Sequence, residues 1–384
     1  MASGDTKTEA LLSALENGGD ISNVVGCCNT NLQNYIIGSI DSLDSAKQII
    51  EQKGGTVGDT GLSGLAEEIA SIPSGGSGDW GTVTYLDDNN VEQTVKIQNA
   101  YEYSTLGQID QSNLNPATIS DITIPKNKIT KIVVGKDADY SPYGFMLNAT
   151  NLNSLTGTEN WEHIEAYCLQ GCKLEHPIDL SNVTTVEVGF MSGSNQYNQP
   201  VSLPKVVTIG NNFLNGCSSF DSQVTFSDSL TSVGTNFLYN CSSFNHQIIF
   251  PDSLKTIGAG FMNICVSFNS AISLGGVETI GSHFMTGCTA FAQSLTIPAT
   301  ISDNTATIGA PFMYNCNNFT GPLVCNAPTR NQALGSSTQT LATTDSTAPM
   351  YATGVTLSGP YASIWKNRYS NRTSSPYRNL TVQS

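Results

Sequence analysis

The octet FLNGCSSF occupies residues 213–220, and a near copy, FLYNCSSF, occupies residues 237–244. Weaker copies of the same octet start at residues 145, 168, 190, 261, 284 and 312. Successive starts are separated by 23, 22, 23, 24, 24, 23 and 28 residues. Such a steady period over eight copies indicates a solenoid, in which each repeat forms one coil and stacks on its neighbours.

Each repeat also contains a turn and a strand. An Ile-Gly or Val-Gly pair precedes six of the octets, which gives the predicted turn glycines Gly189, Gly210, Gly234, Gly258, Gly281 and Gly309. We expect these glycines to adopt positive φ, which glycine tolerates best. A short alternating strand ending in proline follows the octet in several repeats, as at Val201–Pro204, Ile248–Pro251 and Leu295–Pro298. Alternation turns one side of such a strand inward. The sequence therefore predicts a mainly β solenoid of about eight coils of 22–28 residues.

Stacked coils would bury the aromatic and cysteine positions of the octet in one continuous core. Adjacent strands lie about 4.8 Å apart, so eight coils would make a rod on the order of 40 Å long. Neighbouring cysteines at this spacing could be bridged, but Ser194 and Ala149 fill the same position in other coils. We therefore interpret the cysteines as small buried hydrophobic residues. The predicted core is Phe190, Phe213, Cys217, Phe220, Phe237, Cys241, Phe244, Phe261, Cys265, Phe268, Phe284, Cys288, Phe291, Phe312, Cys316 and Phe319.

The phrases IG..F..GC..F and SLT.IP resemble the bacterial BspA-type leucine-rich repeat over about residues 125–327. The sequence differs in having phenylalanine where leucine is usual, and in a long insertion between Gly135 and Phe145. The resemblance implies a curved leucine-rich scaffold used for adhesion or recognition. It does not identify a ligand.

The flanking segments predict a division into four parts. Residues 1–78 show three short amphipathic helical patterns and end in the flexible stretch SGGSG, which predicts a helical attachment or oligomerisation region. Residues 79–124 contain an expected β-hairpin, with DDNN at residues 87–90 as its turn, that would cap the first coil. Residues 125–330 form the predicted solenoid, and residues 331–384, including Trp365, form the predicted C-terminal cap.

The opening GDTKTEALLSALENGGDIS, the segment GLSGLAEEIASIP, the hairpin WGTVTYLD, the repeats and the ending TGVTLSGPYASIWKNRYSNRTSSPYR together resemble virion structural proteins of tailed bacteriophages, of the fibre or appendage type. This resemblance covers nearly the whole chain. It implies a virion protein assembled in the cytoplasm of the bacterial host. Its N-terminal part would contact other virion proteins as a homo-oligomer, for which a trimer is one candidate, and its repeats would project toward a host glycan or protein.

Composition narrows the function further. Charged residues make up 12% of the chain and the net charge is −15, which argues against nucleic acid as a partner. The N-terminus shows no signal-peptide pattern, and no apolar run is long enough to span a membrane. We therefore expect no membrane partner.

Candidate catalytic and metal-binding groups are few. Asp228 and Asp252 occupy equivalent places one coil apart, at a spacing that would suit a retaining glycosidase, but each is also an ordinary turn residue. The His163–His176 stretch could suggest zinc, yet the repeat register turns its two cysteines into the core. The vicinal pair Cys27 and Cys28 lacks the spacing of a metal or redox site. We expect no enzyme activity, no cofactor and no metal.

The remaining candidate is the surface. Tyr239 and Tyr314 share the variable third place of the octet, and they would stand exposed on a neutral exterior rich in Asn, Ser and Thr. Such a face suits glycan recognition, although a merely soluble, low-charge exterior explains it equally well. The preferred function is host attachment as a tail fibre or receptor-binding protein. The alternatives are a head decoration or head-fibre protein, a bacterial cell-surface leucine-rich adhesin, and a particle-bound polysaccharide hydrolase.

Overall fold

The computed structural model describes residues 78–107, 116–301, 313, 315–327, 356–363, 366 and 381–383. The helices expected within residues 1–77 lie outside this part of the chain. So do Gly309, Phe312, Tyr314 and Trp365.

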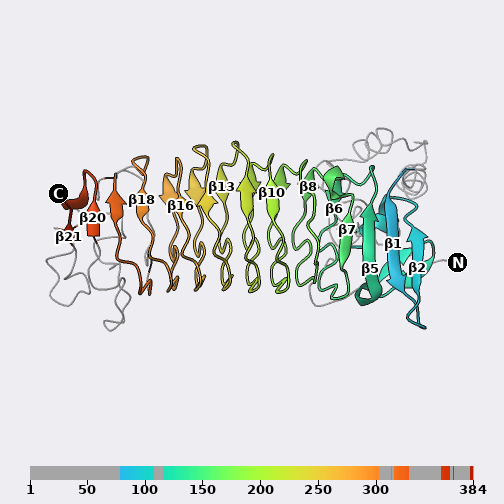
Figure 1. Cartoon of the computed structure of the whole chain (residues 1–384). Helices are drawn as coiled ribbons and strands as arrows, with labels where there is room; N and C mark the ends of the chain where they lie inside the picture. The colour runs from blue at the N-terminus through green and yellow to red at the C-terminus, as the bar shows by residue number, and fades with distance from the viewer. Residues whose placement is uncertain are drawn as a thin grey trace, which may run out of the picture.

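The coils stack side by side into one elongated body (Figure 1). Seven coils each place a short strand just before the octet, and these seven strands form one parallel sheet. They are β6 (Tyr140–Ser141), β8 (His163–Ile164), β9 (Thr185–Val186), β11 (Thr208–Ile209), β13 (Ser232–Val233), β15 (Thr256–Ile257) and β17 (Thr279–Ile280). The sequence had shown these segments only as part of the Ile-Gly pairs.

The strands expected after the octets form a second, interrupted set of parallel pairs. β10 (Val201–Leu203) pairs with β12 (Val224–Phe226), and β14 (Ile248–Ile249) pairs with β16 (Ile272–Ser273). Four strands then close the C-terminal end, namely β18 (Leu295–Ile297), β19 (Leu323–Cys325), β20 (Thr356–Ser358) and β21 (Thr381–Val382). Parallel pairing of strands between successive coils confirms the predicted β solenoid.

The expected hairpin is present at the N-terminal end. β1 (Gly81–Leu86) pairs antiparallel with β2 (Glu92–Lys96) and, on its other side, with β5 (Ile129–Val134). β5 in turn pairs parallel with β7 (Ser154–Thr156). One four-stranded sheet therefore carries the chain from the hairpin into the first coil.

A helix and a second hairpin complete this end of the stack. They comprise α5 (Ala100–Ser104), β3 (Ala117–Ile119) and β4 (Ile122–Ile124), followed by the 3-10 turns η1 (Lys126–Lys128) and η2 (Thr158–Asn160). Tyr103 of α5 is fully buried; its hydroxyl donates to the Tyr140 carbonyl oxygen at 3.0 Å and accepts from Trp161 Nε1 at 2.8 Å. Tyr103 and Trp161 therefore cover the apolar end of the first coil.

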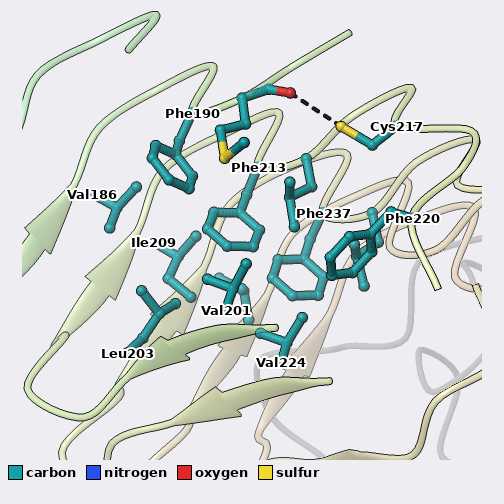
Figure 2. Packing of buried hydrophobic residues seen from close by; sticks show 14 of the residues in the cluster. Val186, Phe190, Val201, Leu203, Ile209, Phe213, Cys217, Phe220, Val224 and Phe237 are labelled. Atoms are coloured by element: carbon teal, nitrogen blue, oxygen red, sulfur yellow. Dashed lines mark hydrogen bonds between the residues drawn. The ribbon is translucent and has the colours of Figure 1, made fainter. Parts of the chain in front are cut away.

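The core consists of two parallel stacks of aromatic rings. Phe213 and Phe237 have ring centroids 5.2 Å apart and planes 4° apart. Phe220 and Phe244 repeat this arrangement in the second stack, at 5.7 Å and 4°. Figure 2 shows the first stack running from Phe190 through Phe213 to Phe237, with strand residues such as Ile209 packed beside it. All the predicted core side chains that the structure describes are buried.

The role predicted for four of the turn glycines is wrong. Gly210, Gly234, Gly258 and Gly281 do not have positive φ. A Cβ added at Gly210 would lie 2.6 Å from the Glu187 carbonyl carbon of the preceding coil, so the glycine is required by close approach of two backbones. Gly189 does have φ +82°, but β9 aligns Val186 with Ile209, which places Gly189 two residues beyond the position of Gly210.

Two glycine substitutions separate these requirements. Gly210→Ala introduces a Cβ against backbone atoms and should lower the free energy of unfolding by more than about 2 kcal/mol. Gly193 has φ +72° but no atom within 4 Å of an added Cβ, so Gly193→Ala should cost only the left-handed penalty of about 1 kcal/mol. Chemical denaturation of both variants measures the difference. Equal losses would contradict the close-approach explanation.

Candidate recognition surface

Columns of hydroxyl groups run along the exterior of the seven-stranded sheet. In six of the seven strands the second, apolar residue, such as Ile209 or Val233, is buried and its neighbour is at least partly exposed. Both residues of β6 are buried. The outward residues are paired in register from coil to coil: Thr185, Thr208, Ser232, Thr256 and Thr279. From β9 to β17 the sheet therefore presents one hydroxyl per coil, repeated at strand spacing, about 4.8 Å.

A second polar column follows the second aromatic stack. The backbone N–H of Asp221 donates to Asn198 Oδ1 at 2.8 Å, that of Asn245 donates to Asp221 Oδ1 at 2.9 Å, and that of Asn269 donates to Asn245 Oδ1 at 2.7 Å. Each side-chain oxygen thus fixes the next coil. Because these acceptors are occupied within the fold, the column contributes more to stacking than to ligand binding.

The third place of the octet behaves differently. Tyr239 is half-buried rather than exposed as predicted. The same place in the next two coils holds Asn263 and Thr286. The Asn240 N–H donates to the Asn263 carbonyl oxygen, and the Ile264 N–H donates to the Thr286 carbonyl oxygen. Among the described residues, Asn263 Oδ1 and Thr286 Oγ1 are buried atoms without a hydrogen-bond partner.

Two apolar residues stand beside this row. Ile264 is 39% exposed and has φ +64°, a conformation that is strained for a β-branched residue. Val266 is 37% exposed, in a place where the two preceding coils have Ser218 and Ser242. Tyr239, Asn263, Ile264, Val266 and Thr286 therefore form the least regular part of the exterior, and we call them the Tyr239 patch.

A charged cluster near the N-terminal coils escaped the sequence analysis. Glu165 and Glu187 follow β8 and β9, in the column that holds Gly210 and its successors. Burial raises the pKa of the Glu165 carboxyl; His163, whose Nε2 lies 3.7 Å from Glu165 Oε1, lowers this pKa, and the Glu187 charge raises it. The sequence analysis aligned Gly189 with Gly210, whereas strand pairing shows that Glu187 is the counterpart of Gly210.

The candidate catalytic and metal groups that the structure describes do not assemble into a site, and Cys27 and Cys28 lie outside the described residues. Asp228 and Asp252 are both exposed turn residues. Cys168 and Cys172 are buried in the core. Within the described residues, no three His, Cys, Asp or Glu side chains converge to hold a metal ion. In the same part of the chain, no helix has the length and apolar character of a membrane span.

Comparison with known proteins identifies the repeat. Residues 81–198 and 190–320 match the BspA type leucine-rich repeat region, in six copies. No curated protein matches the chain.

The chain is also similar to two leucine-rich repeat proteins with crystal structures. A leucine-rich repeat protein from Eubacterium ventriosum is 11% identical, with a TM-score of 0.28, over 64% of this chain and 85% of that one. A leucine-rich cell surface protein from Faecalibacterium prausnitzii is 15% identical, with a TM-score of 0.37, over 78% of this chain and 93% of that one.

The Glu165 cluster gives a pH-dependent prediction. Glu187→Gln removes a neighbouring negative charge, so the pKa of Glu165 should fall, as measured by NMR titration of labelled glutamate side chains. A carboxyl with a raised folded pKa stabilises the fold at low pH and loses that contribution as pH rises through its folded pKa. Glu165→Gln should therefore flatten this part of the stability profile.

Glu278→Gln is the matched control, because Glu278 is an exposed carboxylate paired with Lys255 at 3.0 Å in a distant coil. This variant should leave the pKa of Glu165 unchanged. An equal shift in both variants would show that the two glutamates do not interact specifically.

Proposed function

The chain belongs to the BspA-type leucine-rich repeat family, and we propose that it is a non-enzymatic attachment protein whose solenoid exterior binds a cell-surface partner. One observation carries the proposal. Between residues 181 and 329 there are only eight charged residues, while one column of hydroxyl groups runs from β9 to β17. An exterior of this kind binds through hydrogen bonds and apolar contact rather than through charge.

A host surface glycan fits this chemistry best. Sugars offer neutral hydroxyls to hydrogen-bonding side chains and C–H faces to aromatic rings. The Tyr239 patch combines an aromatic ring with the half-buried polar residues Asn263 and Thr286 in neighbouring coils. A host protein remains the second type of partner for the same patch.

We further propose that the protein is a fibre or receptor-binding appendage of a tailed bacteriophage. The motifs of the two flanks support this, because they resemble virion proteins over nearly the whole chain. In this arrangement residues 1–78 join other virion proteins and the repeats project. A head decoration or head-fibre protein would use the same arrangement at another place on the particle.

A bacterial cell-surface adhesin is the second candidate. The repeat family itself favours it, because adhesion and recognition are the uses that the repeat resemblance implies. Antibodies against the protein separate the candidates, because they would label purified phage particles in one case and intact bacterial envelopes in the other. A particle-bound polysaccharide hydrolase would instead release sugar, and would lose that activity on Asp252→Asn.

The Tyr239 patch should carry the affinity. Tyr239→Ala removes the ring and should weaken binding of the full-length protein to a bacterial surface polysaccharide by about tenfold, the equivalent of one good aromatic contact. Glycan-array and calorimetric titrations measure this change.

Tyr101→Ala is the control, because Tyr101 is 46% exposed on the N-terminal cap, away from the patch. It should bind as the unaltered protein does. If Tyr239→Ala also binds normally, or if both variants lose affinity equally, the patch is not the binding surface.

The attachment region gives a separate prediction. Full-length protein should form a defined oligomer, and residues 79–384 alone should be monomeric, because the proposed contacts lie within residues 1–78. Light scattering on both chains measures their mass. A monomer in both cases would contradict the oligomeric fibre and leave a free-standing recognition protein.

A further inference from the structure

The cysteines of the octet do more than fill space. The thiol of Cys217 donates to the Met191 carbonyl oxygen of the preceding coil, with sulfur and oxygen 3.1 Å apart (Figure 2). Five other octet cysteines repeat this bond at 2.8–3.1 Å: Cys172, Cys241, Cys265, Cys288 and Cys316. Together with Ser194 we call these residues the donor ladder.

The accepting carbonyls belong to strained residues. Met191, Leu214 and Leu238 have φ between +51° and +52°, in the left-handed region that non-glycine residues rarely adopt. Each of these carbonyls already accepts an N–H from its own coil, as Leu214 does from Cys217 at 3.2 Å. The thiol of the next coil takes the second lone pair. Each rung therefore links two coils at a backbone position that is costly to maintain.

The two exceptions to cysteine follow the same rule. Ser194 replaces the thiol with a hydroxyl, which donates to the Leu169 carbonyl oxygen at 2.9 Å. Ala149 lies in the first coil and has no donor, but the corresponding acceptor there is the Gly107 carbonyl, and the buried Lys126 amine donates to it. Gly107 is identified as the equivalent of Met191 by the backbone hydrogen bonds. The Met146 N–H donates to the Leu106 carbonyl, just as the Leu214 N–H donates to the Phe190 carbonyl, and Gly107 follows Leu106 as Met191 follows Phe190. A hydrogen-bond donor, rather than a small apolar volume, is therefore the shared requirement.

Protonation is assured in the folded chain. Burial raises the pKa of Cys217 and of Cys316 to about 12 in each case, so both thiols remain S–H at physiological pH. All the described cysteines are buried and free. A thiolate or a disulfide sulfur would have no proton to donate.

We propose that the donor ladder makes folding of the solenoid conditional on reduced cysteines. The chain closes its coils only while the ladder thiols carry protons, and closure then buries them from oxidants. The solenoid would accordingly be formed in a reducing compartment before the protein meets an oxidising exterior. This inference does not rest on the attachment function.

The opposing reaction is thiol–disulfide exchange in the unfolded chain. Two ladder thiols lose two protons and two electrons and form one S–S bond, while one small-molecule disulfide, such as oxidised glutathione, is reduced to two thiols. Each such bond removes two donors and ties together residues whose side chains must point at separate carbonyls.

Matched substitutions in the full-length protein test the donor requirement. Cys241→Ser keeps a donor, whereas Cys241→Ala does not, so the serine variant should melt at least about 2 °C higher than the alanine variant. Ser194→Cys should be tolerated and Ser194→Ala should lower Tm. A small-hydrophobe role predicts the reverse order at position 241, and that order would overturn the proposal.

Refolding tests the redox condition. Denatured wild-type protein should regain its native circular dichroism in dithiothreitol and lose most of that recovery in oxidised glutathione. A variant with serine at all six ladder cysteines should recover in both buffers, although it retains Cys27, Cys28, Cys168 and Cys325. Wild-type recovery that is equal in both buffers would contradict the proposal.

If the six-serine variant fails to fold in either buffer, the decisive comparison is the pair at position 241 together with wild-type refolding. Loss of cell-surface binding without a refolding defect would concern the attachment function alone. A refolding defect with normal binding by the native protein would concern the ladder alone.

Discussion

The distance between successive coils governs the rest of the structure. Parallel strands in register bring each residue within about 5 Å of its counterpart one repeat away, so every position must be compatible with a near-copy of itself. Phenylalanine satisfies this condition by offset stacking, as Phe213 and Phe237 do. Glycine satisfies it where two backbones meet, and Asn245 satisfies it by accepting an N–H from the next coil. The repeated octet is the sequence record of this single constraint.

Because the period is visible in the chain, the solenoid and the buried faces of the octet could be predicted without coordinates. The backbone conformation at the individual glycines could not be predicted in the same way. Val188-Gly189 and Ile209-Gly210 look alike in sequence, yet only strand pairing of Val186 with Ile209 shows that the two glycines occupy different places. The reason for Gly210 was also hidden, since a glycine demanded by positive φ and one demanded by a neighbouring backbone are identical letters. Distinguishing them requires the position of the preceding coil.

The exterior was predictable in composition but not in arrangement. The scarcity of charge and the abundance of Asn, Ser and Thr can be counted in the chain. The sequence does not show that the asparagine oxygens are consumed by neighbouring N–H groups while the threonine hydroxyls face outward in register. It also does not reveal that Glu165 and Glu187 adjoin, because their coils lack the glycine that marks this column elsewhere. Bonding within the fold decides which polar groups remain for a partner.

Coil stacking limits which positions can vary to give binding specificity. The aromatic places, the donor ladder and the glycine column are each fixed by the coil on either side, so substitutions there change stacking before they change recognition. The third, fourth and sixth places of the octet are not fixed in this way. In two neighbouring coils they hold Tyr239 in the first and Ile264 and Val266 in the second. Ile264 retains a strained backbone where neighbouring coils use Asn240 and Gly287. Isoleucine, asparagine and glycine therefore all occupy this left-handed backbone position, so the stack does not require one particular side chain there.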